Sequence, residues 1–365
     1  MASAPRENLA FNRDHALARP WIVGTDETVL VTGANGFIGA RVVKTLIDYG
    51  FQHIRCLVRP SGRLARLQDV IRSAGLSQAS VEIIEGNLLS REDCQKAARG
   101  AALVFHLAAG NDKSFAGCFM NSVLTTRNLL DALVESGTLK RLVNVSSFAV
   151  YSTFGSRRGA LVDETTPLEA QPLERCDPYG YAKLKQDQIV EQYHQQFGVQ
   201  YVIVRPGAVF GPGKGALSGR IGIDTFGLFL HMGGSNRIPL TYVDNCSEAI
   251  VLAGIVAGVQ GEVFNVVDDD LPTSRQFLRL YKRHAGWFKS VPVPYALSYF
   301  MSAIWERYSV WSQGQLPRRF NRRRAVAEWR RQKYSNRKLK SMLGWTPRVP
   351  FGEAIRLYLG SVAKA

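Results

Sequence analysis

The chain has 365 residues, of which 46% are hydrophobic and 21% are charged, and its formal net charge is +16. This size and this apolar content predict a globular, soluble protein with one large hydrophobic core, or one core and a smaller lobe. No apolar run is long enough to span a bilayer, and the first residues lack the apolar core of a signal peptide. We therefore expect a cytoplasmic protein.

The residue types that bind metals or form disulfides show no pattern in this chain. The cysteines are widely spaced and odd in number, which favours free thiols. The six histidines are scattered in the same way, so we expect no metal. The five cysteines are Cys56, Cys94, Cys118, Cys176 and Cys246.

The first predicted strand follows a polar and irregular stretch. Residues 1 to about 26 carry no recognisable chemistry, and we interpret them as an extension or cap outside the fold. Residues 28–32 then form a short apolar strand, which leads directly into Gly33, Gly36 and Gly39.

The three glycines have separate roles in a phosphate-binding turn. Gly33 permits a sharp turn after the strand, Gly36 leaves room for a pyrophosphate against the backbone, and Gly39 lets the next helix pack closely on the sheet. Apolar residues continue at helical spacing up to Gly50, which is typical of a βαβ unit. The stretch predicts a dinucleotide site, with a purely structural turn as the alternative.

The end of the second strand indicates which dinucleotide binds. Residues 53–58 form this strand, and Arg59 follows it without an acidic residue beside it. A carboxylate at this position usually binds the ribose hydroxyls of NAD, whereas the 2′-phosphate of NADP needs a cation. Arg59 therefore favours NADP. NAD stays open, because an arginine can also stack on adenine or face solvent.

Two further strands, residues 81–85 and 102–107, end in small residues. Gly86-Asn87-Leu88 follows the first of them and Ala108-Ala109-Gly110 follows the second. Ligands of open α/β sheets bind outside the carboxyl ends of the strands, where these turns converge. We interpret His106, within the fourth strand, as a buried structural histidine.

The next part of the chain supplies hydroxyl, phenol and amine groups. A helix is predicted from about Phe119 to Glu135, and a fifth strand over residues 141–147 ends in two serines. After a long loop, Asp177 and Pro178 are suited to cap and open another helix.

Tyr179 and Lys183, in the first turns of that helix, are four residues apart and share one face, whereas Tyr181 points elsewhere.

Lowering a phenol pKa from near 10 to about 7 takes roughly 4 kcal/mol of preferential phenolate stabilisation. The Lys183 ammonium and a cofactor's positive charge can supply it. Ser147 can then hold the substrate oxygen while Tyr179 exchanges a proton. Taken singly, each residue has a structural alternative: Ser147 as a turn residue, Tyr179 as a packing residue and Lys183 as a surface cation. Together, in this order behind the glycine turn, they predict a catalytic set.

These motifs resemble the extended branch of the short-chain dehydrogenase/reductase superfamily. That branch holds nucleotide-sugar epimerases and dehydratases, 3β-hydroxysteroid dehydrogenases and dihydroflavonol reductases. The resemblance covers residues 28 to about 355. It is carried by residues 32–39, 106–109, 145–151, 179–183, 205–213, 242–245 and 343–347.

The resemblance implies a fold, an activity and a site. The fold is α/β, a Rossmann-type doubly wound parallel sheet with a smaller, partly interleaved C-terminal substrate lobe. The implied parts are an extension over residues 1–26, a dinucleotide-binding domain over 27–205, and a substrate lobe over 206–365. Part of this lobe, about 240–268 with a strand near 261–267, returns to the main sheet.

The implied activity is that of an NAD(P)-dependent dehydrogenase or reductase. The catalytic set is Ser147, Tyr179 and Lys183, with Asn121 in the position of a supporting asparagine. The implied cofactor contacts are Gly33, Asn35, Gly36, Phe37, Ile38, Gly39, Arg59, Asn87, Leu88, Ala108, Ala109, Tyr179, Lys183, Pro206 and Val209.

Some residues depart from the family pattern. Asn87 stands where an aspartate is common near adenine, and its amide oxygen can still accept a hydrogen bond. Ala208 and Ile238 stand where many nucleotide-sugar enzymes have an asparagine and an arginine, which weakens that assignment. Three other cations remain as candidates to hold a diphosphate: Lys214, Arg220 and Arg237.

Two enzyme functions therefore stay open. One is net hydride transfer to or from a secondary alcohol or ketone of an apolar or glycosylated molecule. The other is a nucleotide-sugar epimerase or dehydratase that retains NAD. A cofactor-binding sensor without turnover is a third hypothesis, and the intact catalytic set speaks against it. The aromatic-rich stretches 222–234 and 291–311 either give the substrate pocket apolar walls or form ordinary core.

The positive charge is concentrated in residues 318–340, which contain 11 lysines and arginines. The hypotheses are the solvated face of a helix, or a surface for anionic lipid or an acidic substrate. We expect no nucleic-acid partner, because no recognised binding motif accompanies the charge. A homodimer through the helices around 119–135 and 179–193 is usual in the resembling family.

Overall fold

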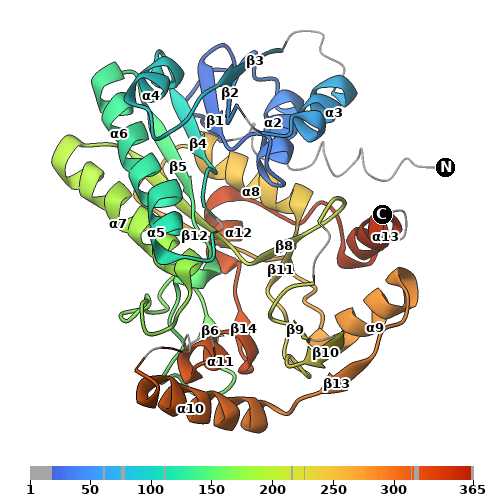
Figure 1. Cartoon of the computed structure of the whole chain (residues 1–365). Coiled ribbons are helices and arrows are strands. Elements are labelled where there is room, and N and C mark those ends of the chain that lie inside the picture. Colours follow the sequence, from blue (N-terminus) through green and yellow to red (C-terminus); the bar gives the residue numbers. More distant parts are fainter. Residues whose placement is uncertain are drawn as a thin grey trace.

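The computed structural model describes residues 19–60, 62–74, 79–110, 112–214, 217–225, 227–313, 315 and 320–362. Its centre is a seven-stranded parallel sheet in the order β12-β7-β5-β4-β1-β2-β3 (Figure 1). These strands are β1 (Thr28–Thr32), β2 (His53–Val58), β3 (Ser80–Glu85), β4 (Leu103–His106), β5 (Arg141–Val145), β7 (Tyr201–Pro206) and β12 (Val263–Val266).

Helices cover both faces of this sheet. On one face lie α2 (Gly39–Asp48), α3 (Ala65–Ser73), α8 (Val243–Ile255) and α12 (Arg337–Leu343). On the other lie α4 (Arg91–Ala98), α6 (Thr125–Ser136) and α7 (Pro178–Phe197). The sheet is therefore doubly wound, as predicted.

The predicted helix from about Phe119 to Glu135 is present but composite. It begins with α5 (Phe115–Cys118), continues as the π-helical turn η1 (Phe119–Leu124) and becomes α6 only at Thr125.

The order of the strands fixes where a ligand binds. The chain passes outward from β1 to β2 and β3, and then returns to place β4 on the other side of β1. A crevice opens at such a reversal, above the carboxyl ends of the strands. The strand predicted at 261–267 is confirmed, because β12 pairs with β7 at the edge of the sheet, with Phe264 opposite Val204.

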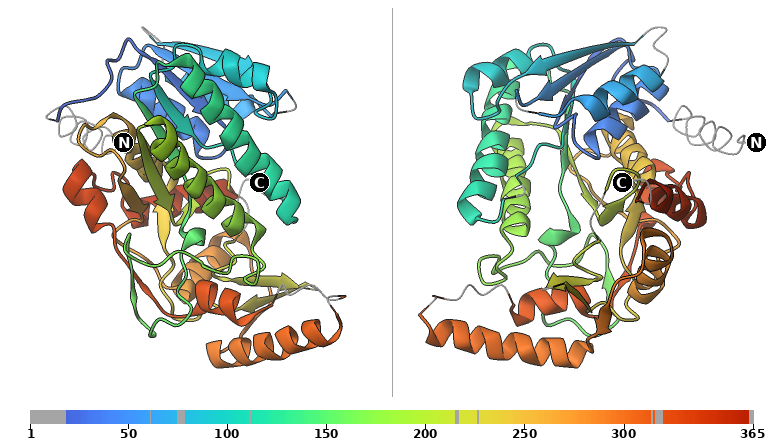
Figure 2. Two further views of the ribbon diagram at one scale, coloured as in Figure 1. Left: turned by 90° about the vertical axis from the view of Figure 1, so that its left-hand side faces the viewer. Right: turned by 45° about the vertical axis from the view of Figure 1, so that its right-hand side comes forward.

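A smaller lobe lies beyond the carboxyl ends of the sheet (Figures 1 and 2). It contains the sheet of β9 (Gly222–Thr225), β10 (Leu228–His231) and β13 (Ser290–Pro292), and the pairs β8 (Ala208–Phe210) with β11 (Leu240–Tyr242) and β6 (Leu161–Val162) with β14 (Lys333–Tyr334). Its helices are α9 (Ser274–Ala285), α10 (Tyr295–Trp311), α11 (Arg322–Trp329) and α13 (Phe351–Val362).

Residues 19–26 pack on the sheet domain, which differs from the prediction of an extension up to about residue 26. The Trp21 ring stacks on Phe51 with 6.0 Å between centroids, and Val23 is buried. The Ile22 amide donates to the Ile255 carbonyl oxygen at 2.9 Å. Three apolar residues are enough to cover the end of α8, although the surrounding stretch is polar.

His106 is a buried structural residue, as expected. Its Nδ1 lies 2.8 Å from the Thr32 hydroxyl and its Nε2 lies 2.8 Å from the Thr126 hydroxyl. Burial lowers the pKa of His106 to about 3, so the ring is neutral and links β1, β4 and α6. The five cysteines are free thiols. Within the described ranges, no helix is long and apolar enough to cross a membrane.

Candidate active site

The glycine turn has the close packing that a phosphate cradle requires. Gly33 has a φ of +68°, in the left-handed region that favours glycine. A Cβ at Gly39 would lie 2.1 Å from the Gly33 carbonyl oxygen, so no other residue fits there. Helix α2 begins at Gly39 without a side-chain cap. The Ala40 amide donates to the Gly36 carbonyl oxygen at 3.2 Å, and the Arg41 and Val42 amides donate to the Ile38 carbonyl oxygen at 3.0 Å, so the glycine turn just before them is the part of the backbone that can face an anion.

Two hollows meet at this turn. The larger, of about 680 Å³, lies over the carboxyl ends of the sheet, and the smaller, of about 210 Å³, lies toward β2 and β3. Both are lined by Gly33, Gly36, Leu107 and Ala109. A long ligand can therefore cross the turn with one end in each hollow, and this arrangement fits a dinucleotide with its pyrophosphate on Gly36.

The structure places the predicted cofactor contacts around these hollows. Two of them, Tyr179 and Lys183, also belong to the predicted catalytic set. The larger hollow is lined by Gly33, Gly36, Phe37, Ile38, Gly39, Ala109, Tyr179, Lys183, Pro206 and Val209. The smaller is lined by Gly33, Asn35, Gly36, Arg59, Asn87, Leu88, Ala108 and Ala109.

Additional cations surround the turn. The Arg66 guanidinium lies 5.6 Å and the Lys214 ammonium 5.5 Å from the centroid of the Phe37 ring. The sequence analysis did not single out Arg66, because its closeness to the glycine turn depends on where helix α3 lies in the folded protein.

The predicted catalytic set converges on one wall of the larger hollow, which Ser147, Tyr179 and Lys183 all line. Asp177 caps α7 by accepting a hydrogen bond from the Gly180 amide at 3.1 Å, as predicted. This start puts Tyr179 and Lys183 one above the other on the inner face of the helix. The Tyr181 ring instead packs edge-on against Phe115, at 5.5 Å between centroids.

Hydrogen bonds tie both helix side chains to the end of β5. The Lys183 ammonium donates to the Val145 carbonyl oxygen at 2.7 Å. The Tyr179 phenol shares a hydrogen bond with the Ser147 hydroxyl. The three groups are thus held in a row between β5 and α7.

Burial controls the protonation of this row. It raises the pKa of Tyr179 to about 12, although the hydrogen bond with Ser147 works in the opposite direction. It also lowers the pKa of Lys183 to about 8. In this state Tyr179 is a proton donor, and the protein groups alone do not produce the acidic phenol that the sequence suggested. The positive charge of a bound nicotinamide is the remaining contribution to phenolate stabilisation.

Asp187 supports this row from behind, and sequence analysis did not single it out. It lies four residues after Lys183 on α7 and is fully buried, and its charge raises the pKa of Lys183. It accepts hydrogen bonds from Asn144 at 2.8 Å and Ser146 at 2.9 Å, and it pairs with Arg205 at 3.0 Å. The spacing of Tyr179, Lys183 and Asp187 by fours was the available signal.

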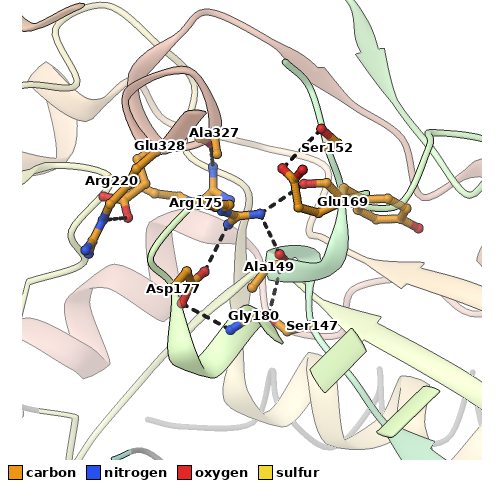
Figure 3. Close-up of polar contacts among 12 residues, drawn as sticks. Ser147, Ala149, Ser152, Glu169, Arg175, Asp177, Gly180, Arg220, Ala327 and Glu328 are labelled. Atoms are coloured by element: carbon orange, nitrogen blue, oxygen red, sulfur yellow. Dashed lines mark hydrogen bonds and ion pairs between the residues drawn. The ribbon is translucent and has the colours of Figure 1, made fainter. Parts of the chain in front are cut away.

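Arg175 is a second residue that the sequence did not reveal (Figure 3). Its guanidinium donates to the carbonyl oxygens of Ala149 at 2.7 Å and Tyr151 at 3.1 Å, and it pairs with Asp177 at 3.1 Å. It thereby joins the short 3₁₀ turn η2 (Phe148–Val150), which follows Ser147, to the cap of the helix that carries Tyr179. Arg175 therefore links the turn that carries Ser147 to the helix that carries Tyr179.

Asn121 lies apart from the predicted catalytic set. It borders the smaller hollow, and its side-chain amide donates to the Gly117 carbonyl oxygen at 3.0 Å within the helix. The π-helical turn rotates it toward Gly110, whose added Cβ would lie 2.7 Å from the Asn121 Cβ. Asn87 uses its side-chain oxygen in its own turn, accepting from the Leu89 amide at 3.0 Å.

The rest of the larger hollow is mainly apolar, as its far walls come from the smaller lobe. Of the three cations considered for a diphosphate, only Lys214 lines it within the described ranges. Arg220 donates to the Ala327 carbonyl oxygen at 3.0 Å, and Arg237 lies in a separate surface hollow beside α9. The apolar walls are formed by Val209, Phe210, Leu217, Ile221, Leu240, Phe277 and Tyr358.

The two aromatic-rich stretches do not form these walls. Phe229 and Met232, in the first stretch, are core residues of the smaller lobe, which agrees with the alternative interpretation. The second stretch contains α10, most of whose large apolar side chains are exposed. The core interpretation holds only for the start of this stretch, where Val293 and Tyr295 pack on the cluster of Met232, Ala325 and Trp329. Most of α10 is neither a wall of the larger hollow nor core.

The basic segment does not form one free helix face. Arg318 and Arg319 lie outside the described residues, and the others are spread over α11, β14, α12 and the link between α11 and β14. Five of them pair with carboxylates: Arg322 with Glu306, Arg323 with Glu169, Arg324 with Glu328, Lys338 with Glu262 and Lys340 with Asp269.

Known proteins are similar to this chain in sequence and in fold. Residues 29–266 match the model of the NAD dependent epimerase/dehydratase family. The chain is 24% identical to 3beta-hydroxysteroid-dehydrogenase/decarboxylase isoform 1 of Arabidopsis thaliana, over 93% of this chain and 80% of the relative. It is also 24% identical to the decarboxylating sterol-4-alpha-carboxylate 3-dehydrogenase of Dictyostelium discoideum, over 78% of this chain and 86% of that relative.

Among solved structures, the UDP-glucuronic acid 4-epimerase of Bacillus cereus in complex with NAD is similar in fold. The TM-score is 0.67 at 20% identity, and the match covers 92% of this chain and 99% of the epimerase. The family model covers more than half of the chain and includes the glycine turn, Ser147, Tyr179 and Lys183. The chain therefore belongs to the NAD dependent epimerase/dehydratase family, within the extended short-chain dehydrogenases/reductases, and is an NAD(P)-dependent oxidoreductase.

Proposed function

We propose that this enzyme transfers a hydride between NADP(H) and a secondary alcohol or ketone of a largely apolar molecule. The observation that carries the proposal is the larger hollow, which combines the row of Ser147, Tyr179 and Lys183 with mainly apolar walls. The names of the relatives from Arabidopsis thaliana and Dictyostelium discoideum refer to a 3β-hydroxysteroid and a sterol-4α-carboxylate, which carry a secondary alcohol on a largely apolar ring system.

The site residues have distinct roles in this proposal. A nicotinamide held in the larger hollow would supply the hydride chemistry. In the reducing direction the substrate is a carbonyl compound. Ser147 donates a hydrogen bond to the carbonyl oxygen, and Tyr179 gives that oxygen its proton. Lys183, held by Val145, stabilises the phenolate that remains. In the oxidising direction the same groups take up the proton.

NADP is proposed as the cofactor on the basis of Arg59. This arginine is exposed at the carboxyl end of β2 and lines the smaller hollow together with Asn35 and Asn87. No acidic residue lines that hollow among the described residues, so a 2′-phosphate meets no repulsion there.

Replacing Arg59 by Ala is expected to weaken NADPH binding by about tenfold or more and to leave NADH binding nearly unchanged. The reason is that a charge-assisted hydrogen bond contributes roughly 1.5–3 kcal/mol. Titration of cofactor fluorescence measures both affinities. Arg72→Ala is the matched control, because Arg72 is exposed on α3 and pairs with Asp69 at the surface. Equal losses for both cofactors would show that Arg59 does not read the 2′-phosphate.

The alternative is a nucleotide-sugar epimerase or dehydratase that retains NAD. Lys214 favours it, because an ammonium beside the glycine turn can hold a substrate phosphate. Purified protein is therefore mixed with NADPH and either lipophilic ketones, such as steroid ketones, or nucleotide-ketosugars, and the absorbance of NADPH is followed. We expect consumption with lipophilic ketones. Consumption with ketosugars alone, or release of tightly bound NAD on denaturation, would favour the alternative.

Oligomeric state is a separate proposal. A homodimer through η1, α6 and α7 stays a prediction, which sedimentation of the purified protein tests.

A further inference from the structure

Helix α10 presents an apolar face to solvent. Six large side chains on one side of the helix are between 47% and 76% exposed. Their positions follow the helical period, so they form a continuous stripe from Leu297 to Trp311. We call this set the α10 stripe: Leu297, Phe300, Met301, Ile304, Tyr308 and Trp311.

The opposite side of the helix, which faces the protein, carries polar residues of the kind that usually face water. The fully buried residues of α10 are Ser298, Ser302 and Ser309, and the helix packs on α11. Two half-buried aromatic residues also pack on the protein, Tyr295 near Trp329 and Trp305 against Phe320. A surface helix of a soluble protein normally buries its apolar side, and monomers rarely leave an apolar patch of this extent uncovered. The arrangement of α10 is inverted, and it leaves the larger side chains free to contact a partner.

The location of α10 suits contact with an extended surface. The helix forms the outer edge of the smaller lobe, far from the parallel sheet, in all the views of Figures 1 and 2. No residue of α10 lines the larger hollow among the described residues, so the stripe is separate from the catalytic site.

The charge around α10 indicates an anionic partner. Residues 295–331 contain eight arginines, no lysine, no aspartate and only two glutamates, so the segment is strongly positive. Arg318 and Arg319 lie outside the described residues, and three others pair with carboxylates: Arg322, Arg323 and Arg324. Glu306, the one carboxylate of α10, pairs with Arg322 at 2.7 Å. Arg307 is exposed within the turns of the stripe, and the charges of Arg158 and Arg330 act on Tyr295 at the start of the helix.

We propose that α10 docks the protein on an anionic lipid membrane, with the α10 stripe inserted at the interface and exposed arginines such as Arg307 facing the headgroups. Tyrosine and tryptophan prefer the boundary between headgroups and acyl chains, and α10 carries five of them. A helix that lies in the interface needs an apolar face flanked by cations. The apolar face belongs to α10, and the cations are Arg307 and arginines of the neighbouring segments.

A second copy of the chain fits this surface less well. A stable dimer buries about 800 Å² on each partner, more than the face of a single helix provides, and it would bring two arginine-rich regions together. A membrane supplies both the apolar layer and the negative charge.

The experiment is flotation of the full chain with vesicles of phosphatidylcholine alone, or of phosphatidylcholine and phosphatidylglycerol in equal parts. We expect binding to the anionic vesicles that falls with added salt. Phe300→Ser with Ile304→Ser is expected to weaken it at least about tenfold, because two buried apolar anchors are lost. Arg307→Gln is expected to weaken binding to anionic vesicles only.

Phe197→Ser with Leu357→Ser is the matched control, because both residues are similarly exposed but lie on α7 and α13. This control should bind vesicles like the unchanged protein. NADPH binding, measured in parallel, checks that each variant is folded. Equal vesicle binding of the α10 and control variants would overturn the proposal. It would also be overturned if the unchanged protein ignored vesicles and sedimented as a dimer that the α10 variant dissociates.

Discussion

Replacement of Tyr179 by Phe is expected to lower turnover at least about a hundredfold while leaving NADPH affinity nearly unchanged. The phenylalanine ring keeps the packing at the start of α7 but has no hydroxyl to exchange a proton with the substrate oxygen, and a lost general acid or base costs about that factor. Ser147 keeps its hydrogen bond from the Ala149 amide at 3.2 Å, so the turn that carries it should remain in place. Steady-state kinetics and a cofactor titration measure the two quantities.

The chain provides a matched control two residues away. Tyr181→Phe removes a hydroxyl from the same helix, but the Tyr181 ring packs against Phe115 and does not line the larger hollow. Its turnover should stay within about twofold of the unchanged enzyme, since no reacting group is altered. Near-normal turnover of Tyr179→Phe would remove Tyr179 from the chemistry. A large loss in both variants would point to a disturbed helix.

The parts of the site that the sequence predicted depend on contacts between near neighbours. The glycine turn is specified within eight residues, and the spacing of Tyr179 and Lys183 is set by one turn of helix. Local patterns of this kind also predicted the strands and the Asp177 cap. They could not reveal Arg175, whose partners at Ala149 and Tyr151 lie more than 20 residues away.

The error over α10 has a specific physical reason. Its aromatic composition suggested a buried position, but composition does not say which side of a helix faces the protein. Ser298, Ser302 and Ser309 recur at helical spacing, and this was the signal of an inverted helix. The basic segment misled in a similar way, because the carboxylates that pair with its residues come from distant parts of the chain, such as Glu169 and Glu262.

Replacement of Asp187 by Ala is expected to destabilise the protein by about 3–5 kcal/mol. Asp187 and Arg205 are both almost fully buried, and removing one partner leaves the other charge unpaired in a low-dielectric interior. Lys183, also buried, would then lie near a second uncompensated cation. Urea denaturation measures the change in the free energy of unfolding. Asp69→Ala is the control, because Asp69 pairs with Arg72 at the surface and its loss should cost less than about 1 kcal/mol.

A milder change at the same position separates stability from catalysis. Asp187→Asn keeps the shape of the side chain but removes the negative charge that raises the pKa of Lys183. In this variant the pKa of Lys183 should therefore fall below the value of about 8 that it has in the unchanged protein. Lys183 then loses its proton at a lower pH, and with it the phenolate loses its nearby cation. The alkaline limb of the pH–activity profile is therefore expected to move to lower pH, with turnover near neutrality reduced more than substrate affinity. An unchanged profile in a folded Asp187→Asn enzyme would mean that Asp187 serves only to neutralise Arg205.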